Sequence, residues 1–482
     1  MHPVISLTAK TQQIDNLVLV LSGMQSLPRG LFTNAEKEYI NQHKEDRKKE
    51  IISFNRLDYW IYLYFIKKDD EKTKLLEECR KAGDQVAKCL NDHKARRIVV
   101  FDTEARAQEI LAFAEGMALG SYQFLKYKKD KKDKHSLKEI QIYSGAINQA
   151  SIHHLNILIN AVYQCRTLIN EPNSYLSAPV FAREVETMVL EYGVKVEILN
   201  RKKLEALKMG GILAVNKGSA EPPTFTILEW NPADAKNTKP IVFVGKGIVY
   251  DSGGMNLKTG STMQDMKDDM SGAAAVASVI LAIAKAGLPV FVVGLLPATD
   301  NRPGVNAMVP GDVIRMHNGT NVEVIDTDAE GRLILADALS YASKYDPCLV
   351  IDLATLTGSA QRAVGKVAAV VMQSKAEKEM ELLKESGFEV YERLIEFPMW
   401  EEYGEMIKSE LADLKNLGPP EAGSITAGKF LEHFTRYPYI HIDIAGPAFL
   451  EKRDSYRGQG GTGFGVRLLF DFVKKWSLAT TS

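Results

Sequence analysis

The sequence is poor in cysteine and lacks any long apolar run. Its four cysteines, Cys79, Cys89, Cys165 and Cys348, are widely spaced and form no CxxC pair. Secreted scaffolds that depend on disulfides are much denser in cysteine, so the sequence predicts reduced thiols and a cytoplasmic location. No stretch approaches the ~20 consecutive apolar residues of a membrane-spanning helix. The first residues lack the basic, apolar and small-residue order of a signal peptide, so no membrane partner is expected.

An excess of charge of either sign is also missing. The chain has 60 Lys and Arg residues against 61 Asp and Glu residues, which gives a formal net charge of -1. Nucleic acids and anionic membranes attract proteins through positive charge, so no nucleic-acid partner is expected. The lysine-rich segment 126–138 also contains Asp130 and Asp133, which favours a solvated loop over a nucleic-acid patch.

The 482 residues do contain an alternation of strand and helix patterns. Residues 1–145 predict a smaller N-terminal α/β domain, residues 146–169 a connecting helix, and residues 170–482 a larger C-terminal α/β domain. In the C-terminal region, β-branched apolar runs at 241–244, 290–293, 349–351 and 439–444 alternate with helical patterns at 273–286 and 333–345. This alternation predicts a mostly parallel central sheet flanked by helices, with function at the loops beyond the strand ends.

Two segments of the C-terminal region stand out because polar groups crowd beside strand ends. The first, 245–254, is followed by Lys258 and by segment 267–273; the second is 326–333. Within the second, Asp328, Glu330 and Arg332 alternate with small residues, and an extended chain would point all three side chains the same way. Two carboxylates held together at a buried strand end repel each other unless a cation lies between them, and a divalent metal can fill that role.

Lys246 lies at the end of a predicted buried strand, between two glycines that permit a close approach of the backbone. A buried lysine can lose its proton, and the neutral amine can then be a metal ligand. Each feature also has an ordinary interpretation. A DxE pair is commonly a solvated edge or a helix start, and Arg332 and Lys246 could be surface charges. The two segments together favour a carboxylate metal site without deciding the matter.

Other catalytic patterns are absent from the sequence or occur in the wrong context. No HExxH zinc motif and no GxxxxGK[ST] phosphate loop occurs. Segment 458–463 fits GxGxxG, but it lies near the C-terminus and opens no βαβ unit, so a nucleotide-dependent oxidoreductase is a distant alternative.

Taken together, the two polar segments closely resemble the signatures of the leucyl aminopeptidase family, also called cytosol aminopeptidases. The family hallmark Asn-Thr-Asp-Ala-Glu-Gly-Arg-Leu is matched by Asp326 to Leu333 except at its first position. A GKGxxxDSGG element at 245–254, the lysine that follows it and a DMxGAA element from Asp269 onwards occur in the expected order. The resemblance extends from about Ala146 to the C-terminus, and before that it is weaker.

The resemblance implies a smaller, variable N-terminal domain and a larger catalytic domain, assembled as a homohexamer. It implies a two-metal aminopeptidase that uses metal-activated water, forms no covalent intermediate and favours Leu and other apolar first residues. The partners are then peptide substrates with a free N-terminus. The cofactors are two divalent metal ions per subunit, usually zinc, with manganese, magnesium or cobalt accepted at one site.

The resemblance also assigns metal ligands. The tight metal site takes Lys246, Asp251, Asp269 and Glu330, and the exchangeable site takes Asp251, Asp328 and Glu330. Asp251 and Glu330 would therefore bridge the two ions.

The remaining assignments concern catalysis and specificity. Lys258 resembles the family's donor to the developing oxyanion. Arg332 resembles the arginine that binds bicarbonate, and the bound anion would take a proton from water. The pocket for the first side chain of the substrate is assigned to Met266, Thr355, Gly358, Ala445 and Ala448.

Two positions depart from the family pattern. Asp326 replaces the usual Asn and adds negative charge near the exchangeable site, and Asp268 adds a carboxylate beside Asp269, where a small residue is common. Neither change removes a ligand, but both could alter metal preference. The alternative from another class is a non-catalytic family member that acts as a scaffold or DNA-binding regulator. Such pseudoenzymes usually lose ligands, whereas this chain has every one.

Overall fold

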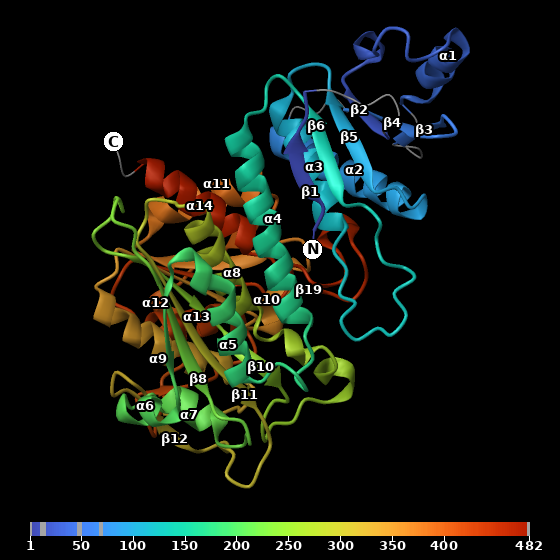
Figure 1. Cartoon of the computed structure of the whole chain (residues 1–482). Helices are drawn as coiled ribbons and strands as arrows, with labels where there is room; N and C mark the ends of the chain where they lie inside the picture. Colours follow the sequence, from blue (N-terminus) through green and yellow to red (C-terminus); the bar gives the residue numbers. More distant parts are fainter. Residues whose placement is uncertain (1, 10–15, 46–50, 67–70, 480–482) are drawn as a thin grey trace. The chain divides into compact units, whose positions relative to one another are not determined.

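The computed structural model describes residues 2–9, 16–45, 51–66 and 71–479, apart from the side chains of residues 261 and 262. The chain forms two compact units: Met1–Tyr163 with Lys452–Gln459, and Gln164–Glu451 with Gly460–Ser482. Helix α4 (Gln149–Asn170) leads from the first unit into the second (Figure 1). The domain limits expected from the sequence, which assign all of 170–482 to one domain, stay a prediction.

The first unit is built on a sheet in the order β1-β6-β5-β2-β4-β3, parallel except for the edge strand β3. The apolar run Leu17–Leu21 forms β2, which lies at the centre of this sheet between β4 and β5. The elements of the unit are β1 (Val4–Leu7), β2 (Leu17–Leu21), α1 (Asn34–His43), β3 (Ile51–Asn55), β4 (Trp60–Phe65), α2 (Lys72–Asp92), β5 (Arg97–Asp102), α3 (Ala107–Gly120) and β6 (Glu139–Tyr143).

The second unit contains the larger sheet, in the order β16-β15-β18-β14-β9-β11-β8-β7, with β10 paired to β11. Its centre is parallel, because β10, β11, β9, β14 and β18 all run the same way. The strands of this sheet are β7 (Lys195–Leu199), β8 (Thr224–Trp230), β9 (Ile241–Gly245), β10 (Gly247–Asp251), β11 (Val292–Asn301), β14 (Leu349–Ala354), β15 (Ala369–Ser374), β16 (Leu394–Glu396) and β18 (Tyr439–Asp443). The mostly parallel sheet expected from the sequence is therefore confirmed, although the strand expected at 290–293 continues to Asn301.

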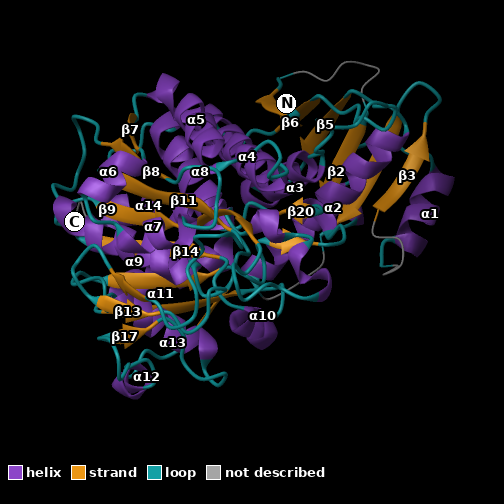
Figure 2. Cartoon of the chain, turned by 90° about the horizontal axis from the view of Figure 1, so that it is seen from below, coloured by secondary structure: helices purple, strands orange, loops and turns teal. Residues whose placement is uncertain are grey.

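Helices cover the sheet of the second unit (Figure 2). Helix α8 packs on β8, β9, β11 and β14, and both α5 and α14 pack against α8. Helices α7 and α9 pack against β11 and contribute to the hydrophobic cluster described below. The helices are α5 (Ala178–Val189), α6 (Arg201–Ala206), α7 (Gly210–Asn216), α8 (Ser271–Lys285), α9 (Gly331–Tyr341), α10 (Gly358–Val364), α11 (Glu377–Glu389), α12 (Glu401–Glu405), α13 (Gly423–Glu432) and α14 (Val466–Ala479). Short strands form two small sheets: β12 (Val313–Arg315), β13 (Asn321–Glu323), β17 (Leu414–Lys415), and β19 (Phe449–Leu450) with β20 (Gly460–Gly461). Within the described part of the chain, we find no helix of the length and apolarity that crossing a bilayer requires.

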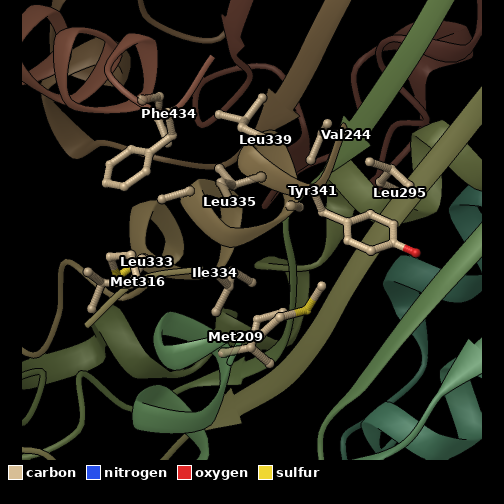
Figure 3. Close-up of a cluster of buried hydrophobic side chains, with 14 of the residues drawn as sticks. Met209, Val244, Leu295, Met316, Leu333, Ile334, Leu335, Leu339, Tyr341 and Phe434 are labelled. Atoms are coloured by element: carbon tan, nitrogen blue, oxygen red, sulfur yellow. The ribbon is translucent and has the colours of Figure 1, made fainter. Parts of the chain in front are cut away.

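The core of the second unit lies between α9 and the sheet. Leu333, Leu335 and Leu339 of α9 point into a cluster that includes Val244 of β9 and Leu295 of β11 (Figure 3). Burial of such side chains stabilises the unit by about 1.5–3 kcal/mol each. The cluster fixes α9 on the sheet, and with it the polar segment that precedes α9.

Helix α8 approaches the sheet too closely for a side chain at its second residue. A Cβ added to Gly272 would lie 2.0 Å from the carbonyl oxygen of Leu353 and 3.0 Å from the backbone nitrogen of Lys246. Backbone atoms cannot give way cheaply, so glycine is required here. The contact sets the spacing between α8 and strands β9 and β14, and β9 leads into the first polar segment, 245–254.

We expect Gly272→Ala to lower the free energy of unfolding by about 1–3 kcal/mol, because the added methyl group overpacks the contact between α8 and β14. The measurement is the denaturant midpoint followed by circular dichroism. Gly404→Ala is the matched control, since its Cβ would meet only the Lys429 side chain, at 3.4 Å. Equal midpoints for the two variants would show that the helix can shift without cost.

Candidate metal centre

Several polar side chains lie at one edge of the larger sheet because parallel strands end there. Lys246 follows β9, Asp251 ends β10, Asn301 ends β11, Thr355 follows β14 and Asp443 ends β18. In open α/β sheets, ligands bind at this carboxyl edge. The strand and helix pattern of the sequence predicts function at such strand ends, and the topology brings these five residues to a common edge.

Three carboxylates converge at this edge. One oxygen from each of Asp251, Asp328 and Glu330 lies within 4.8 Å of the others. Asp251 and Glu330 are buried, whereas the side chain of Asp328 is 34% exposed and forms the open side of the cluster. Oxygen ligands at this spacing are what a divalent cation requires.

The convergence of Asp328 and Glu330 does not come from an extended chain. Residues 327 and 328 form a turn, Glu330 has helical dihedral angles and α9 begins at Gly331, so the expected strand-like alternation is wrong. Asp326 shapes this turn, because its Oδ1 accepts a hydrogen bond from the backbone nitrogen of Asp328 (2.8 Å). The two carboxylates meet because a turn leads directly into a helix.

Two lysines neutralise the carboxylates. Lys246 Nζ lies 2.7 Å from Asp269 Oδ1 and 3.1 Å from Glu330 Oε1. Lys258 Nζ lies 2.8 Å from Asp251 Oδ2 and 2.5 Å from Asp328 Oδ1. The sequence-predicted ligands and the oxyanion donor are therefore in one cluster.

A glycine makes room for Lys246. A Cβ added to Gly331 would lie 2.3 Å from Lys246 Cε and 2.7 Å from Nζ. The same ammonium group donates to the carbonyl oxygen of Thr355 (2.9 Å), and Thr355 Oγ1 donates to Asp269 Oδ1 (2.9 Å). Lys246 is thereby held between β9, β14 and the start of α9.

The pKa values of the cluster reflect burial and crowding of like charge. Burial, followed by the charges of Asp251 and Glu330, raises the pKa of Asp328 to about 7. Burial likewise raises the pKa of Asp269 and that of Glu330, although Lys246 opposes both shifts. These carboxylates resist carrying their charges together, and a bound divalent cation would relieve that cost.

The pKa of Lys246 differs from the sequence hypothesis. Burial lowers it, but the carboxylates of Asp269, Glu330 and Asp251 outweigh burial, so the pKa of Lys246 lies above its usual range. Lys246 is therefore an ammonium group in the metal-free chain. To act as a metal ligand it must give up its proton as the metal binds.

Unpartnered oxygen atoms test whether a metal fits this site. Asp269 Oδ2 and Glu330 Oε2 are buried and have no hydrogen-bond partner among the residues that the structure describes. A buried carboxylate oxygen without a partner is costly, so these atoms fit a role as cation ligands. The donor set of carboxylates and one amine suits zinc, manganese, magnesium or cobalt.

Arg332 offers a complementary site for an anion. Its Nη1 donates to the carbonyl oxygen of Asn416 (2.7 Å), and its Nε is buried with no partner in the described ranges. Burial lowers the pKa of Arg332 to about 10, which leaves it charged near neutral pH. The free donor fits the expected bicarbonate.

Some supporting residues were missed by sequence reasoning. Asn301 Nδ2 donates to Asp251 Oδ1 (2.9 Å) and to the carbonyl oxygen of Thr327 (3.0 Å), so it orients a proposed ligand. The feature that could have identified Asn301 is its position at the end of β11, where it pairs with Asp251. The strand expected from the sequence stopped eight residues earlier, at 293. Asp443 was also missed, because an acidic residue that ends a strand has no motif of its own.

The residues expected to form the pocket lie on three segments of the second unit. Thr355 contacts Asp269, Gly358 begins α10, and Met266 begins the 3₁₀ turn that ends beside Asp269. Ala445 is half-buried and Ala448 buried in the loop that follows β18. The GxGxxG segment does not open a βαβ unit, because β20 pairs antiparallel with β19.

Comparison with known proteins agrees with this geometry. Residues 163–470 match the family model described as the cytosol aminopeptidase family, catalytic domain, and residues 70–131 match the N-terminal domain of the same family. The probable cytosol aminopeptidase of Chlorobaculum tepidum is 44% identical over 431 residues, which cover 84% of each chain. That of Geobacter sulfurreducens is 42% identical over 367 residues, covering 75% of this chain and 74% of the relative.

Solved structures are similar over almost the whole chain. A mutant of tomato leucine aminopeptidase has a TM-score of 0.85 at 27% identity and covers 98% of this chain and 96% of its own. The bottromycin maturation enzyme BotP in complex with Mn has a TM-score of 0.84 at 27% identity and covers 96% of this chain and 99% of its own. The fold, the carboxylate cluster and these relatives support metal-dependent aminopeptidase activity, and the chain belongs to the cytosol aminopeptidase family.

Proposed function

We propose that this chain is a two-metal aminopeptidase that removes N-terminal residues, with Leu and other apolar residues favoured, from peptides with a free amino group. The observation that carries the proposal is the cluster of Asp251, Asp328 and Glu330, whose ligand atoms lie within 4.8 Å of one another beside the buried Lys246 and the half-buried Lys258. Family membership supports the aminopeptidase activity, and the number of metals and the preference for Leu rest on the resemblance to the family.

The proposed tight site uses Lys246, Asp251, Asp269 and Glu330, and the exchangeable site uses Asp251, Asp328 and Glu330. The exposure of Asp328 supports its place at the exchangeable site, because that side of the cluster opens to solvent. When bound, the metals would supply Lewis-acid polarisation of the scissile carbonyl and activation of a water molecule.

The side chains of the chain itself contribute charge and orientation. The anionic cluster favours a cationic α-ammonium group at the substrate's N-terminus. Lys258, whose side chain is 15% exposed, reaches the open side of the cluster and can donate to an oxyanion that develops there. Arg332 can hold bicarbonate through its free Nε, and that anion would accept the proton of the water.

Assembly and location are part of the same proposal. The names of the relatives support a cytoplasmic enzyme, and the family resemblance supports a homohexamer. Zinc is the proposed resident metal, with manganese, magnesium or cobalt exchangeable at one site, and the manganese complex of BotP supports the use of manganese.

The proposal predicts metal-dependent hydrolysis that requires a free amine. Chelation should abolish release of the dye from a leucine anilide, because in the proposed mechanism the metals activate the water molecule. Addition of Mn, Co or Zn should restore the release. The matched control is the N-acetylated leucine anilide, which should remain uncleaved. Equal cleavage of the two substrates would rule out an aminopeptidase.

We expect Lys258→Ala to lower kcat by about 10²–10³, because a donor to the developing oxyanion is lost. Both metals should remain bound, since the lysine competes with the metals for Asp251 and Asp328. Metal analysis and kcat are measured together, with Lys239→Ala as the control because Lys239 makes a surface ion pair with Asp346. Loss of metal from the Lys258 variant would make that lysine structural.

The neighbouring acidic residues Asp268 and Asp269 should behave differently. Asp269 is buried against Lys246 and Thr355, so Asp269→Ala should empty the tight site and abolish activity. Asp268 is half-buried, and burial together with the charge of Asp265 raises its pKa to about 7. Asp268→Ala should therefore keep both metals and most of the turnover, as measured by metal analysis and kcat. The reverse result would exchange their roles and remove Met266 from the pocket.

A further inference from the structure

Asp443 lies outside both the proposed metal ligands and the proposed pocket, yet it contacts the loops that carry most of the pocket. It ends β18, pairs with Ala354 of β14 and is 1% exposed. Its Oδ1 accepts hydrogen bonds from the backbone nitrogens of Leu356 and Ala445, both at 3.1 Å. Its Oδ2 accepts a hydrogen bond from Thr357 Oγ1 (2.7 Å).

These bonds join two separate loops. One loop contains Thr355 and leads to Gly358 at the start of α10, while the other contains Ala445 and Ala448. Four of the five proposed pocket residues therefore lie on segments that the carboxylate of Asp443 ties together. Hydrogen bonds to an ionised carboxylate are about twice as strong as neutral ones, which suits a fixed loop geometry.

The hydrogen-bond network around Asp443 extends to α10 in one direction and to the proposed metal ligands in the other. Thr357 Oγ1 also accepts a hydrogen bond from the backbone nitrogen of Ala360 (3.0 Å) and caps α10. Thr355, two residues earlier, bonds to Lys246 and Asp269 at the metal centre. The loop from 355 to 358 is thus held at one end by proposed metal ligands and at its centre by Asp443.

The second loop is also packed tightly. A Cβ added to Gly446 would lie 2.1 Å from the carbonyl oxygen of Gly365, the residue that follows α10. The backbone nitrogen of Ala448 donates to the carbonyl oxygen of Ile444 (3.1 Å), and the carbonyl oxygen of Ala448 accepts from the backbone nitrogen of Thr462 (2.9 Å). A shift of either loop would therefore be transmitted to the other.

Buried charges surround Asp443. Burial disfavours its ionised form, but the charge of His441 and the three hydrogen bonds oppose burial, and the pKa of Asp443 remains raised. The charge of Asp443 in turn favours the charged forms of His441 and Arg332. His441 is itself fixed by Asp352, whose Oδ1 lies 2.8 Å from His441 Nδ1.

We propose that Asp443 is a positioning residue that sets the shape of the pocket for the first substrate side chain by clamping the 355–358 loop to the 445–448 loop. The inference rests on the proposed aminopeptidase function, because that function defines the peptide substrate whose first side chain enters the pocket. It assigns selectivity to a residue that touches neither the metals nor the substrate.

The chain provides a matched control in Asp337. This carboxylate of α9 is also fully buried, and it accepts hydrogen bonds from the backbone nitrogens of Ile212 and His317, both at 2.9 Å. It therefore ties backbone segments together with the same chemistry but contacts no pocket loop. Asp443→Asn and Asp337→Asn each replace one buried carboxyl group by an amide of the same size.

The experiment measures kcat/KM for leucine and alanine anilides, together with metal content. We expect Asp443→Asn to lower the leucine-to-alanine ratio by about tenfold, since an apolar pocket discriminates by contact with a few methylene groups. Thr357→Val, which removes only the hydroxyl donor and cap, should lower the ratio less. Asp337→Asn should change the ratio by less than about twofold, and all variants should retain their metals.

Hydrogen exchange provides a readout that does not depend on turnover. Segments 355–364 and 444–450 should exchange faster in Asp443→Asn and Thr357→Val than in the wild type or Asp337→Asn, because the clamp is weakened. If the wild type cleaves neither anilide, the proposed aminopeptidase function is wrong. Hydrogen exchange would still test whether Asp443 holds the two loops together.

The proposal is overturned if Asp443→Asn and Thr357→Val keep the wild-type ratio and exchange. It is also overturned if Asp443→Asn loses metal, since Asp443 would then act on the metal centre. Should Asp443→Asn fail to fold, the ratio and exchange of Thr357→Val decide the question.

Discussion

Repulsion among carboxylates at the edge of the larger sheet is the constraint on which the site depends. Asp251, Asp269, Asp328 and Glu330 are gathered where several would not ionise together without cations. Lys246 and Lys258 provide two positive charges from the chain itself. These two ammonium groups offset part of the negative charge of the carboxylates. Binding of a metal at this edge would replace protons and ammonium contacts by coordination, so metal affinity would depend on pH.

The ion pairs between these lysines and carboxylates require close approaches of the backbone. Lys246 reaches its partners only because Gly331 leaves space beside it, and α8 reaches the sheet only because Gly272 has no side chain. The apolar face of α9 against β9 and β11 fixes the same segment from the other side. Packing of the hydrophobic core and geometry of the polar site are therefore determined by the same few contacts.

The sequence predicted the parts of this arrangement that follow from periodicity. Buried β-branched runs gave the central strands, and polar residues after those runs indicated which edge carries the site. Local geometry was harder to predict. The alternation of Asp328, Glu330 and Arg332 resembled a strand, but the hydrogen bond from the backbone nitrogen of Asp328 to Asp326 and the apolar face of α9 favour a turn followed by a helix. The pKa of Lys246 was also beyond sequence reasoning, because its sign depends on three carboxylates from distant segments.

Residues that position others were the least visible in the sequence. Asn301 and Asp443 have no motif spacing, and each acts through bonds to segments 26 to 87 residues away along the chain. Their importance arises from the parallel sheet, which brings the ends of β10, β11, β14 and β18 to one edge. A carboxylate or amide at such an end can bond to the backbone of the neighbouring loop, where a buried N–H otherwise costs about 1–3 kcal/mol. The same sheet thus supplies the proposed ligands Lys246 and Asp251 from two strand ends and the supports for the adjoining loops from others.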